Sequence, residues 1–330
     1  ITIIRIKESG LTTFTDKDLL LKTKDKEITE DLLSQILKHI FKFLPDLGLF
    51  ELCNDQFFNN KRFREIISQL PAPESESSLE FVFPEILREN GYYTYNNAKG
   101  DYNYILDINS VWSGYRTNFK LTKNQAPIFA VYNFNVTHES NMWKRDREKL
   151  KVNPNELKMI PPVFPDDSIV RHSLAVNYSN LIEMDRQVGD LVKSLKKEGL
   201  YENSYIFFYS DHGGPFPRHK RAIYETGTKV PFFVKLPDGK KEKIDKEQFL
   251  SFVDFAPTVL SIAEIEIPSE YQGIPFLGKF KSENKREYLF TSSDRFDENP
   301  DRIRAVRNKK YKYIRNYYPE NSHALDVEYR

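Results

Sequence analysis

The sequence contains very little cysteine and no excess of charge of either sign. Its single cysteine, Cys53, excludes an internal disulfide framework. Lys and Arg number 49 against 48 Asp and Glu, for a formal net charge of +1, so no global field indicates a nucleic acid or a membrane surface as partner. Any selectivity for an anion must therefore be produced locally.

Long apolar runs and an export leader are also missing. No stretch approaches the ~20 apolar residues of a membrane-spanning helix, and no charged segment followed by an apolar one opens the chain. The first residue is Ile1 instead of Met, so we expect a processed or truncated start. With 330 residues the chain is long enough to bury the core of one large α/β domain or two ordinary ones.

Three regions differ in their sequence patterns. Apolar residues recur at helical spacing over 28–44 and predict an amphipathic helix, and the polar, proline-bearing stretch 71–78 is a candidate boundary. We therefore expect a helical N-terminal segment over 1–78, an α/β domain of catalytic type over 79–278 and a smaller, strand-rich C-terminal region over 279–330.

From residue 79 onward, apolar runs of strand length alternate with helical patterns. This order is typical of a largely parallel sheet covered by helices on both faces. Pro231 favours an edge position or a strand start for its strand. The expected strands are 92–96, 128–134, 205–209 and 230–234, followed by short strands within 288–318, and the expected helices are 84–90, 169–197 and 254–263.

Polar side chains follow three of these strands directly. Lys99 and Asp101 follow the first strand, His138 follows the second, and Asp211 and His212 follow the third. Ligands of open α/β sheets bind beyond the carboxyl ends of the strands. Three parallel strands would therefore deliver these side chains to one rim.

Each of these residues also has an ordinary explanation. A histidine after a strand is commonly a hydrogen-bonded loop residue, Asp-His-Gly is common turn chemistry, and Lys99 or Lys220 alone would be a solvated lysine. Three of the six histidines, however, fall in two of these loops: His138, His212 and His219. This convergence favours a site.

Two local clusters suggest what the site binds. Asp211 and His212 offer a carboxylate oxygen and an imidazole nitrogen side by side, which suits a divalent cation; the carboxylate favours calcium or magnesium, whereas the imidazole also accepts a transition metal. Arg218-His219-Lys220-Arg221 can neutralise an anionic substrate, and a solvated charged loop is the alternative.

Several segments, taken in order, resemble the sulfatase family of the alkaline-phosphatase-like superfamily. Residues 205–231 resemble its strand, metal-binding Asp-His-Gly turn and lysine loop, 83–104 its helix, Gly-Tyr turn and downstream lysine, and 135–140 its catalytic histidine loop. The ending, 292–319, is similar to bacterial heparan-sulfatase-like and arylsulfatase enzymes. The ordered set covers roughly 79–318 and is far more specific than any one motif.

The resemblance implies an alkaline-phosphatase-like α/β fold and metal-assisted hydrolysis of a sulfate ester on a sulfated carbohydrate. It also suggests export to the periplasm or the cell exterior. By position it assigns the following roles: His138, Lys220 and Lys99 as catalytic, His219, Arg218 and Asp101 as substrate-binding, and Asp211 and His212 as ligands of Ca²⁺. Asp101 stands where many relatives have a histidine, and His212 where many have an asparagine.

The family nucleophile does not appear in residues 1–78. Relatives carry a Cys/Ser-x-Pro-x-Arg motif, converted to formylglycine, and an acidic pair that holds the metal; Cys53 lacks the Pro and Arg of that motif. Three functions remain open: a sulfatase, a phosphoester hydrolase or phosphotransferase of the same superfamily, and a non-catalytic module that binds sulfated glycans. We expect the chain as given to keep a sulfate pocket without normal turnover.

Overall fold

The computed structural model describes residues 2–5, 82–100, 107–116, 120–125, 127–145, 150–240, 247–297, 299–322 and 324–325. The helix expected over 28–44, the boundary at 71–78, Cys53 and Asp101 lie outside these residues. The chain divides into two compact units, of which one comprises Ile1–Glu8 with Phe81–Arg330 and the other Ser9–Glu80. All described residues belong to the first unit.

A six-stranded sheet forms the centre of this unit. Its strands lie in the order β3 (Gly114–Tyr115), β2 (Tyr93–Asn96), β4 (Ile128–Val131), β1 (Thr2–Arg5), β5 (Tyr205–Tyr209), β6 (Phe232–Lys235). The strands β2, β3 and β4 pair in parallel, and β1 runs antiparallel to both β4 and β5, so β5 has the direction of β4. This confirms the largely parallel sheet, and β6 is an antiparallel edge strand as Pro231 predicted.

The strand β1 differs from the expectation that 1–78 is a helical segment. Residues 2–5 pair with β4 on one side and with β5 on the other, and Ile4 is fully buried between them. The run Thr2-Ile-Ile-Arg5 is mostly β-branched, which suits a strand packed on both faces.

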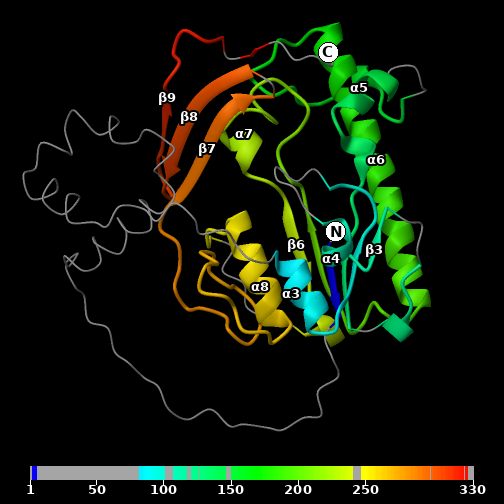
Figure 1. Ribbon diagram of the computed structural model, residues 1–330. Coiled ribbons are helices and arrows are strands. Elements are labelled where there is room, and N and C mark those ends of the chain that lie inside the picture. The colour runs from blue at the N-terminus through cyan, green and yellow to red at the C-terminus, as the bar shows by residue number, and fades with distance from the viewer. Residues whose placement is uncertain are drawn as a thin grey trace, which may run out of the picture. The chain divides into compact units, whose positions relative to one another are not determined.

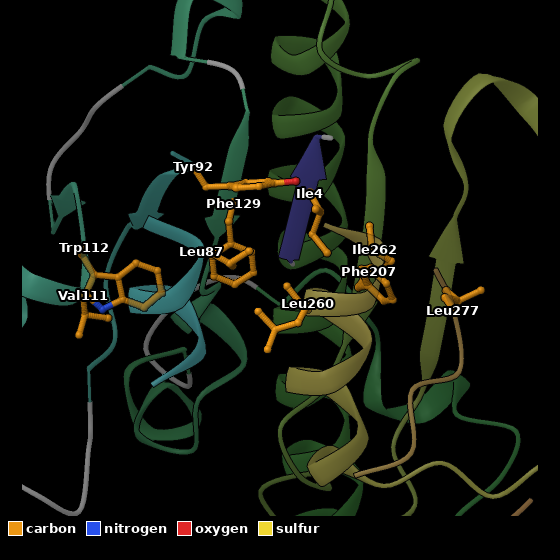
Figure 2. Packing of buried hydrophobic residues seen from close by; sticks show 11 residues of the cluster. Ile4, Leu87, Tyr92, Val111, Trp112, Phe129, Phe207, Leu260, Ile262 and Leu277 are labelled. Atoms are coloured by element: carbon orange, nitrogen blue, oxygen red, sulfur yellow. The ribbon is translucent and has the colours of Figure 1, made fainter. Parts of the chain in front are cut away.

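Helices cover both faces of the sheet, as the alternating pattern predicted (Figure 1). On one face α3 (Phe83–Glu89), α4 (Ile108–Val111) and α8 (Phe255–Ile262) pack in the apolar cluster of Figure 2, which joins residues such as Leu87 and Leu260 to Phe129 of β4. On the other face α6 (Ser168–Lys197) contributes Leu195 to a second cluster.

The long helix α6 begins and ends where its sequence signals indicate. The carboxylate of Asp167 accepts a hydrogen bond from the backbone N–H of Val170 at the start, and two lysines lie in the last turn before Gly199. Tyr178 and Leu181 in the middle of the helix are exposed. Smaller residues are buried there instead: Ala175, Val176, Ser179 and Asn180.

The C-terminal region forms a separate three-stranded antiparallel sheet. Its strands are β7 (Leu289–Phe296), β8 (Asn299–Arg307) and β9 (Lys312–Asn316), which confirms the short strands expected there. The remaining described elements are α5 (Ser140–Arg145), α7 (Glu225–Thr228) and the 3-10 helices η3 (Lys123–Gln125), η4 (Asn135–Thr137), η5 (Pro154–Glu156), η6 (Pro237–Gly239) and η7 (Phe252–Asp254).

The buried carboxylate of Asp254 connects the start of α8 to the segments that lead from α8 to the C-terminal sheet. Asp254 precedes α8 as expected, but its side chain does not cap that helix. It accepts the backbone N–H of Ser251 at 2.9 Å and of Ile274 at 2.7 Å, and the guanidinium of Arg286 binds both of its oxygens. Four donors thus converge on one carboxylate that is only 1% exposed.

No helix in the described part of the chain is both long and apolar enough to cross a membrane.

Candidate active site

Four predicted site residues follow three parallel strands whose carboxyl ends meet at one rim. Lys99 lies after β2, His138 after β4 and Asp211 with His212 after β5. Because β2, β4 and β5 point in one direction, their following loops emerge on the same edge of the sheet. The loop that carries Lys220 reaches this rim from further along the chain.

His138 is the centre of the cluster. Its Nε2 atom lies 3.5 Å from Nζ of Lys220, and its Nδ1 atom lies 2.9 Å from Oγ of Ser140. A lysine ammonium has only donors, and the backbone N–H of Ser140 also points at Nδ1, at 3.3 Å. The ring is thereby oriented from both sides.

The surroundings of His138 keep its imidazole neutral near pH 7. Burial lowers its pKa below the usual value of about 6.5, the nearby charges of Lys220 and Lys99 lower it further, and Glu139 opposes them. His212 contributes in the same direction as the lysines. Two cations therefore act on one imidazole.

An asparagine network places the Lys99 loop beside the His138 loop. The amide of the buried Asn96 donates to the carbonyl of Lys99 at 2.6 Å, and the amide of Asn133 donates to Oδ1 of Asn96 at 3.2 Å. The backbone N–H of Asn133 also donates to Oδ1 of Asn97 at 2.8 Å. These asparagines were not predicted as site residues, although their positions at the ends of β2 and β4 are a usable signal.

Two glycines allow the Asp-His-Gly turn to pack directly on the lysine loop. A Cβ atom on Gly213 would lie 1.8 Å from the carbonyl oxygen of Thr226, and one on Gly227 would lie 2.0 Å from that of Ala222. The N–H of Gly213 donates to the carbonyl of Gly227 at 2.9 Å. This close backbone approach brings the His212 turn and the Lys220 loop together, because only glycine fits there.

A buried ion-pair group lies beneath Lys220. Arg221 binds both oxygens of Glu139, at 2.9 and 2.8 Å, and its Nε donates to Asp297 at 2.5 Å. Burial would lower the pKa of Arg221, but the two carboxylates raise it above its ordinary value. Glu139 and Asp297 were not predicted, and Arg221 was predicted only as part of a basic cluster.

A hollow of about 580 Å³ opens between the lysine loop and β7. Lys220 and His212 line it on one side, and hydroxyl-bearing residues of β7 line it on the other. Figure 1 shows β7 beside α7, and Glu225 of α7 binds Lys312 and Arg307 of the C-terminal sheet at 3.2 Å each. The wall from β7 comprises Thr291, Ser292, Ser293, Arg295 and, after the strand, Asp297.

Two of the three predicted substrate-binding residues, His219 and Arg218, make contacts away from His138. The ring of His219 stacks on Phe164 at 5.9 Å, and its Nδ1 lies 2.9 Å from the carbonyl of Pro217. Arg218 is exposed and lies over the ring of Tyr224, 4.3 Å from its centroid. Asp101 falls outside the described residues. Their roles stay predictions.

The two residues predicted to bind a metal lie next to each other. Nε2 of His212 lies 3.6 Å from Oδ2 of Asp211, whose side chain is 69% exposed, and Nδ1 of His212 lies 2.7 Å from the carbonyl of Gly213. Among the described residues no group of three or more His, Cys, Asp or Glu is placed to hold a metal. Calcium takes six to eight oxygen ligands, so these two side chains alone do not fit it.

Known proteins similar to this chain are sulfatases. An ulvan-active sulfatase of Formosa agariphila is 39% identical over 286 residues, which are 76% of this chain and 48% of the relative. Human N-sulphoglucosamine sulphohydrolase is 31% identical over 112 residues, 34% of this chain and 22% of the relative. The solved structure of the sulfatase YidJ from Bacteroides fragilis overlaps with a TM-score of 0.49 at 17% identity, over 71% of this chain and 67% of that one. The chain spans about half the length of the first of these curated relatives, and less of the second.

Two family models match the sequence, over ranges that overlap between residues 214 and 265. The model described as Sulfatase matches residues 116–265, which include His138, His212 and Lys220. The model described as N-sulphoglucosamine sulphohydrolase, C-terminal, matches residues 214–328. The family suggests a divalent metal in addition to the residues described above. The chain belongs to the sulfatase family of the alkaline-phosphatase-like superfamily.

Proposed function

We propose that this site binds the sulfate ester of a sulfated carbohydrate and belongs to a sulfuric ester hydrolase. The observation that carries the proposal is the convergence of Lys220 and Lys99 on the neutral imidazole of His138 at the rim of the sheet. A sulfate ester is an anion whose S–O bond breaks only when charge on its oxygens is matched and the departing oxygen is protonated.

The residues divide these tasks between them. Lys220 and Lys99 supply positive charge for the sulfate oxygens, and His138, in the imidazolium form that a bound anion favours, can together with Lys220 give a proton to the bridging oxygen as its bond to sulfur breaks. Each positioned proton donor contributes roughly 10²–10⁴-fold. Overall, water adds to sulfur, the sugar leaves as an alcohol, and sulfate is released. The attacking group is not among the described residues.

The hollow beside Lys220 has the chemistry of a sugar site. A volume of about 580 Å³, lined by hydroxyls of β7, a lysine and two arginines, suits a polar ring that carries negative charge. The relative from Formosa agariphila is named for its activity on ulvan, which supports a polysaccharide sulfate as the substrate class. Export from the cell, as the family resemblance suggests, is part of the same proposal.

A sulfate-release assay on a panel of sulfated glycans tests this function. We expect the chain as given to bind a sulfated disaccharide with salt-sensitive affinity and without a burst of sulfate release, because no Cys/Ser-x-Pro-x-Arg motif occurs in its sequence. The unsulfated disaccharide is the control. Equal binding of both sugars would contradict the proposal, and fast release of inorganic phosphate from a phosphate ester would favour the phosphoester hydrolase.

Inorganic sulfate should raise the pKa of His138. A bound dianion stabilises the imidazolium, and by linkage the affinity for sulfate should increase as pH falls through the pKa of His138 in the complex. The gain should level off below the lower pKa that His138 has in the free protein. NMR titration of the imidazole with and without sodium sulfate, against sodium chloride of equal ionic strength, measures both effects. An unchanged His138 pKa would place the sulfate elsewhere.

We further propose that Asp211 and His212 contribute to a calcium site that binds weakly, because no group of three or more His, Cys, Asp or Glu among the described residues is placed to hold the ion. Calcium should raise the melting temperature of the wild-type chain slightly, since a ligand that binds only the folded state stabilises it. Asp211→Asn with His212→Ala should abolish that rise. Magnesium and zinc titrations serve as controls for metal identity, and an equal calcium response in the double variant would refute the assignment.

A further inference from the structure

We propose that Arg221 is a positioning residue that holds the buried carboxylate of Glu139 and thereby leaves Lys220 free to act on His138. Arg221 does not reach the imidazole in this role; it acts through Glu139. The inference rests on the proposed sulfate site for its consequence in catalysis, but its structural basis is the arrangement of four charged side chains beneath the rim.

Lys220 lies between two groups that compete for its ammonium. Its Nζ atom is 3.5 Å from Nε2 of His138 and 3.6 Å from Oε2 of Glu139. The same Oε2 is bound by Arg221 at 2.8 Å, while Oε1 accepts from the other terminal nitrogen at 2.9 Å. Arg221 therefore saturates the carboxylate from one side in the bidentate geometry that guanidinium groups favour.

Burial makes this competition strong. The side chain of Glu139 is 3% exposed and that of Arg221 is 7% exposed, so neither charge is solvated by bulk water. A buried carboxylate that loses its partner must find another cation or a proton, because an unpaired buried charge is costly. Lys220, at 17% exposure, is the nearest alternative among the described residues.

Removal of Arg221 should therefore draw Lys220 onto Glu139. The ammonium would leave the imidazole, and the negative charge of Glu139 would act on His138 with less compensation. Both changes favour the imidazolium. The other groups among the described residues that lower the pKa of His138, Lys99 and His212, are unchanged by the substitution.

Arg221 also binds a second carboxylate, which lies in the C-terminal sheet region. Nε of Arg221 donates to Asp297, which directly follows β7 and lines the hollow beside Lys220. One guanidinium thus joins the histidine loop, the lysine loop and the β7 wall. Lysine at this position has too few fixed donors to bind both oxygens of Glu139 and Asp297 together.

The test is the pKa of His138, measured by NMR without sulfate, in four chains: wild type, Arg221→Met, Glu139→Gln and the double variant. Arg221→Met should raise that pKa and weaken inorganic sulfate binding about tenfold. Glu139→Gln should leave sulfate binding intact and lower the pKa, and adding it to Arg221→Met should return both properties to or beyond the wild-type values. Arg221→Lys should give intermediate values.

A purely structural role for Arg221 predicts a different pattern. The melting temperature of Arg221→Met would fall, but the His138 pKa of the folded chain would stay where it is, and this result would overturn the proposal. If Arg221→Met does not fold, Glu139→Gln still tests the proposal. A higher His138 pKa or weaker sulfate binding in Glu139→Gln would contradict it. Since the pKa measurement needs no substrate, its outcome is independent of whether the proposed sulfatase function holds.

Discussion

Replacement of Lys220 by methionine is expected to weaken binding of a sulfated disaccharide by roughly ten- to a hundredfold. Hydrogen bonds to charged groups contribute about 1.5–3 kcal/mol, and Lys220 is the cation nearest to Nε2 of His138. The fold should persist, because Arg221 still binds both oxygens of Glu139. Isothermal titration calorimetry at two salt concentrations measures the loss and the smaller salt dependence.

The matched control for this variant is Lys193→Met on α6. Lys193 is 81% exposed and pairs only with the exposed Asp190 of its own helix turn, so its removal should change neither affinity nor salt dependence. If Lys220→Met binds the sulfated disaccharide as tightly as wild type does, the site lies elsewhere on the rim. An equal loss in both variants would mean that binding depends only on total charge.

Substitution of Asp254 by alanine should cost about 3–5 kcal/mol of unfolding free energy, the range typical of breaking a buried ion pair from one side. The variant leaves the guanidinium of Arg286 and the N–H groups of Ser251 and Ile274 without their acceptor. Urea denaturation, followed by tryptophan fluorescence, measures the loss.

The comparison variant is Glu264→Gln, which removes an exposed carboxylate 4.0 Å from Lys279. Exposed pairs at such separations contribute little, so its midpoint in urea should match that of the wild type. A small effect of Asp254→Ala would show that water reaches the carboxylate site and that the C-terminal region is held by other contacts.

Periodicity and strand length predicted most of the central fold. The strand at 205–209 has the predicted bounds, and Pro231 correctly placed its neighbour at the edge of the sheet, because a residue without an N–H cannot complete an inner ladder. The strand at 2–5 was missed. Four residues carry too little pattern for a local signal, and their pairing with β4 and β5 depends on partners more than a hundred positions away.

The site was predictable to the extent that it depends on strand ends. Lys99 and His138 follow parallel strands, so topology alone brings them to one rim. Within the basic run 218–221 the resemblance assigned roles to Arg218, His219 and Lys220 but none to Arg221, because consecutive residues of a turn point in different directions and the pattern does not show which of them is buried. Arg218 has a positive φ of 67° and an exposed side chain, whereas Arg221 is buried. No spacing rule distinguishes these two arginines.

The link between Arg221 and Asp297 spans 76 positions of sequence. During synthesis at about 5–20 residues per second, the ribosome therefore adds Asp297 roughly 4–15 s after Arg221. Once β6 is complete at Lys235, the nascent chain contains the whole central sheet but still lacks the wall of the hollow that β7 supplies. A premature stop between β6 and β7 would release a chain with the rim in place and no complete cavity for a sugar.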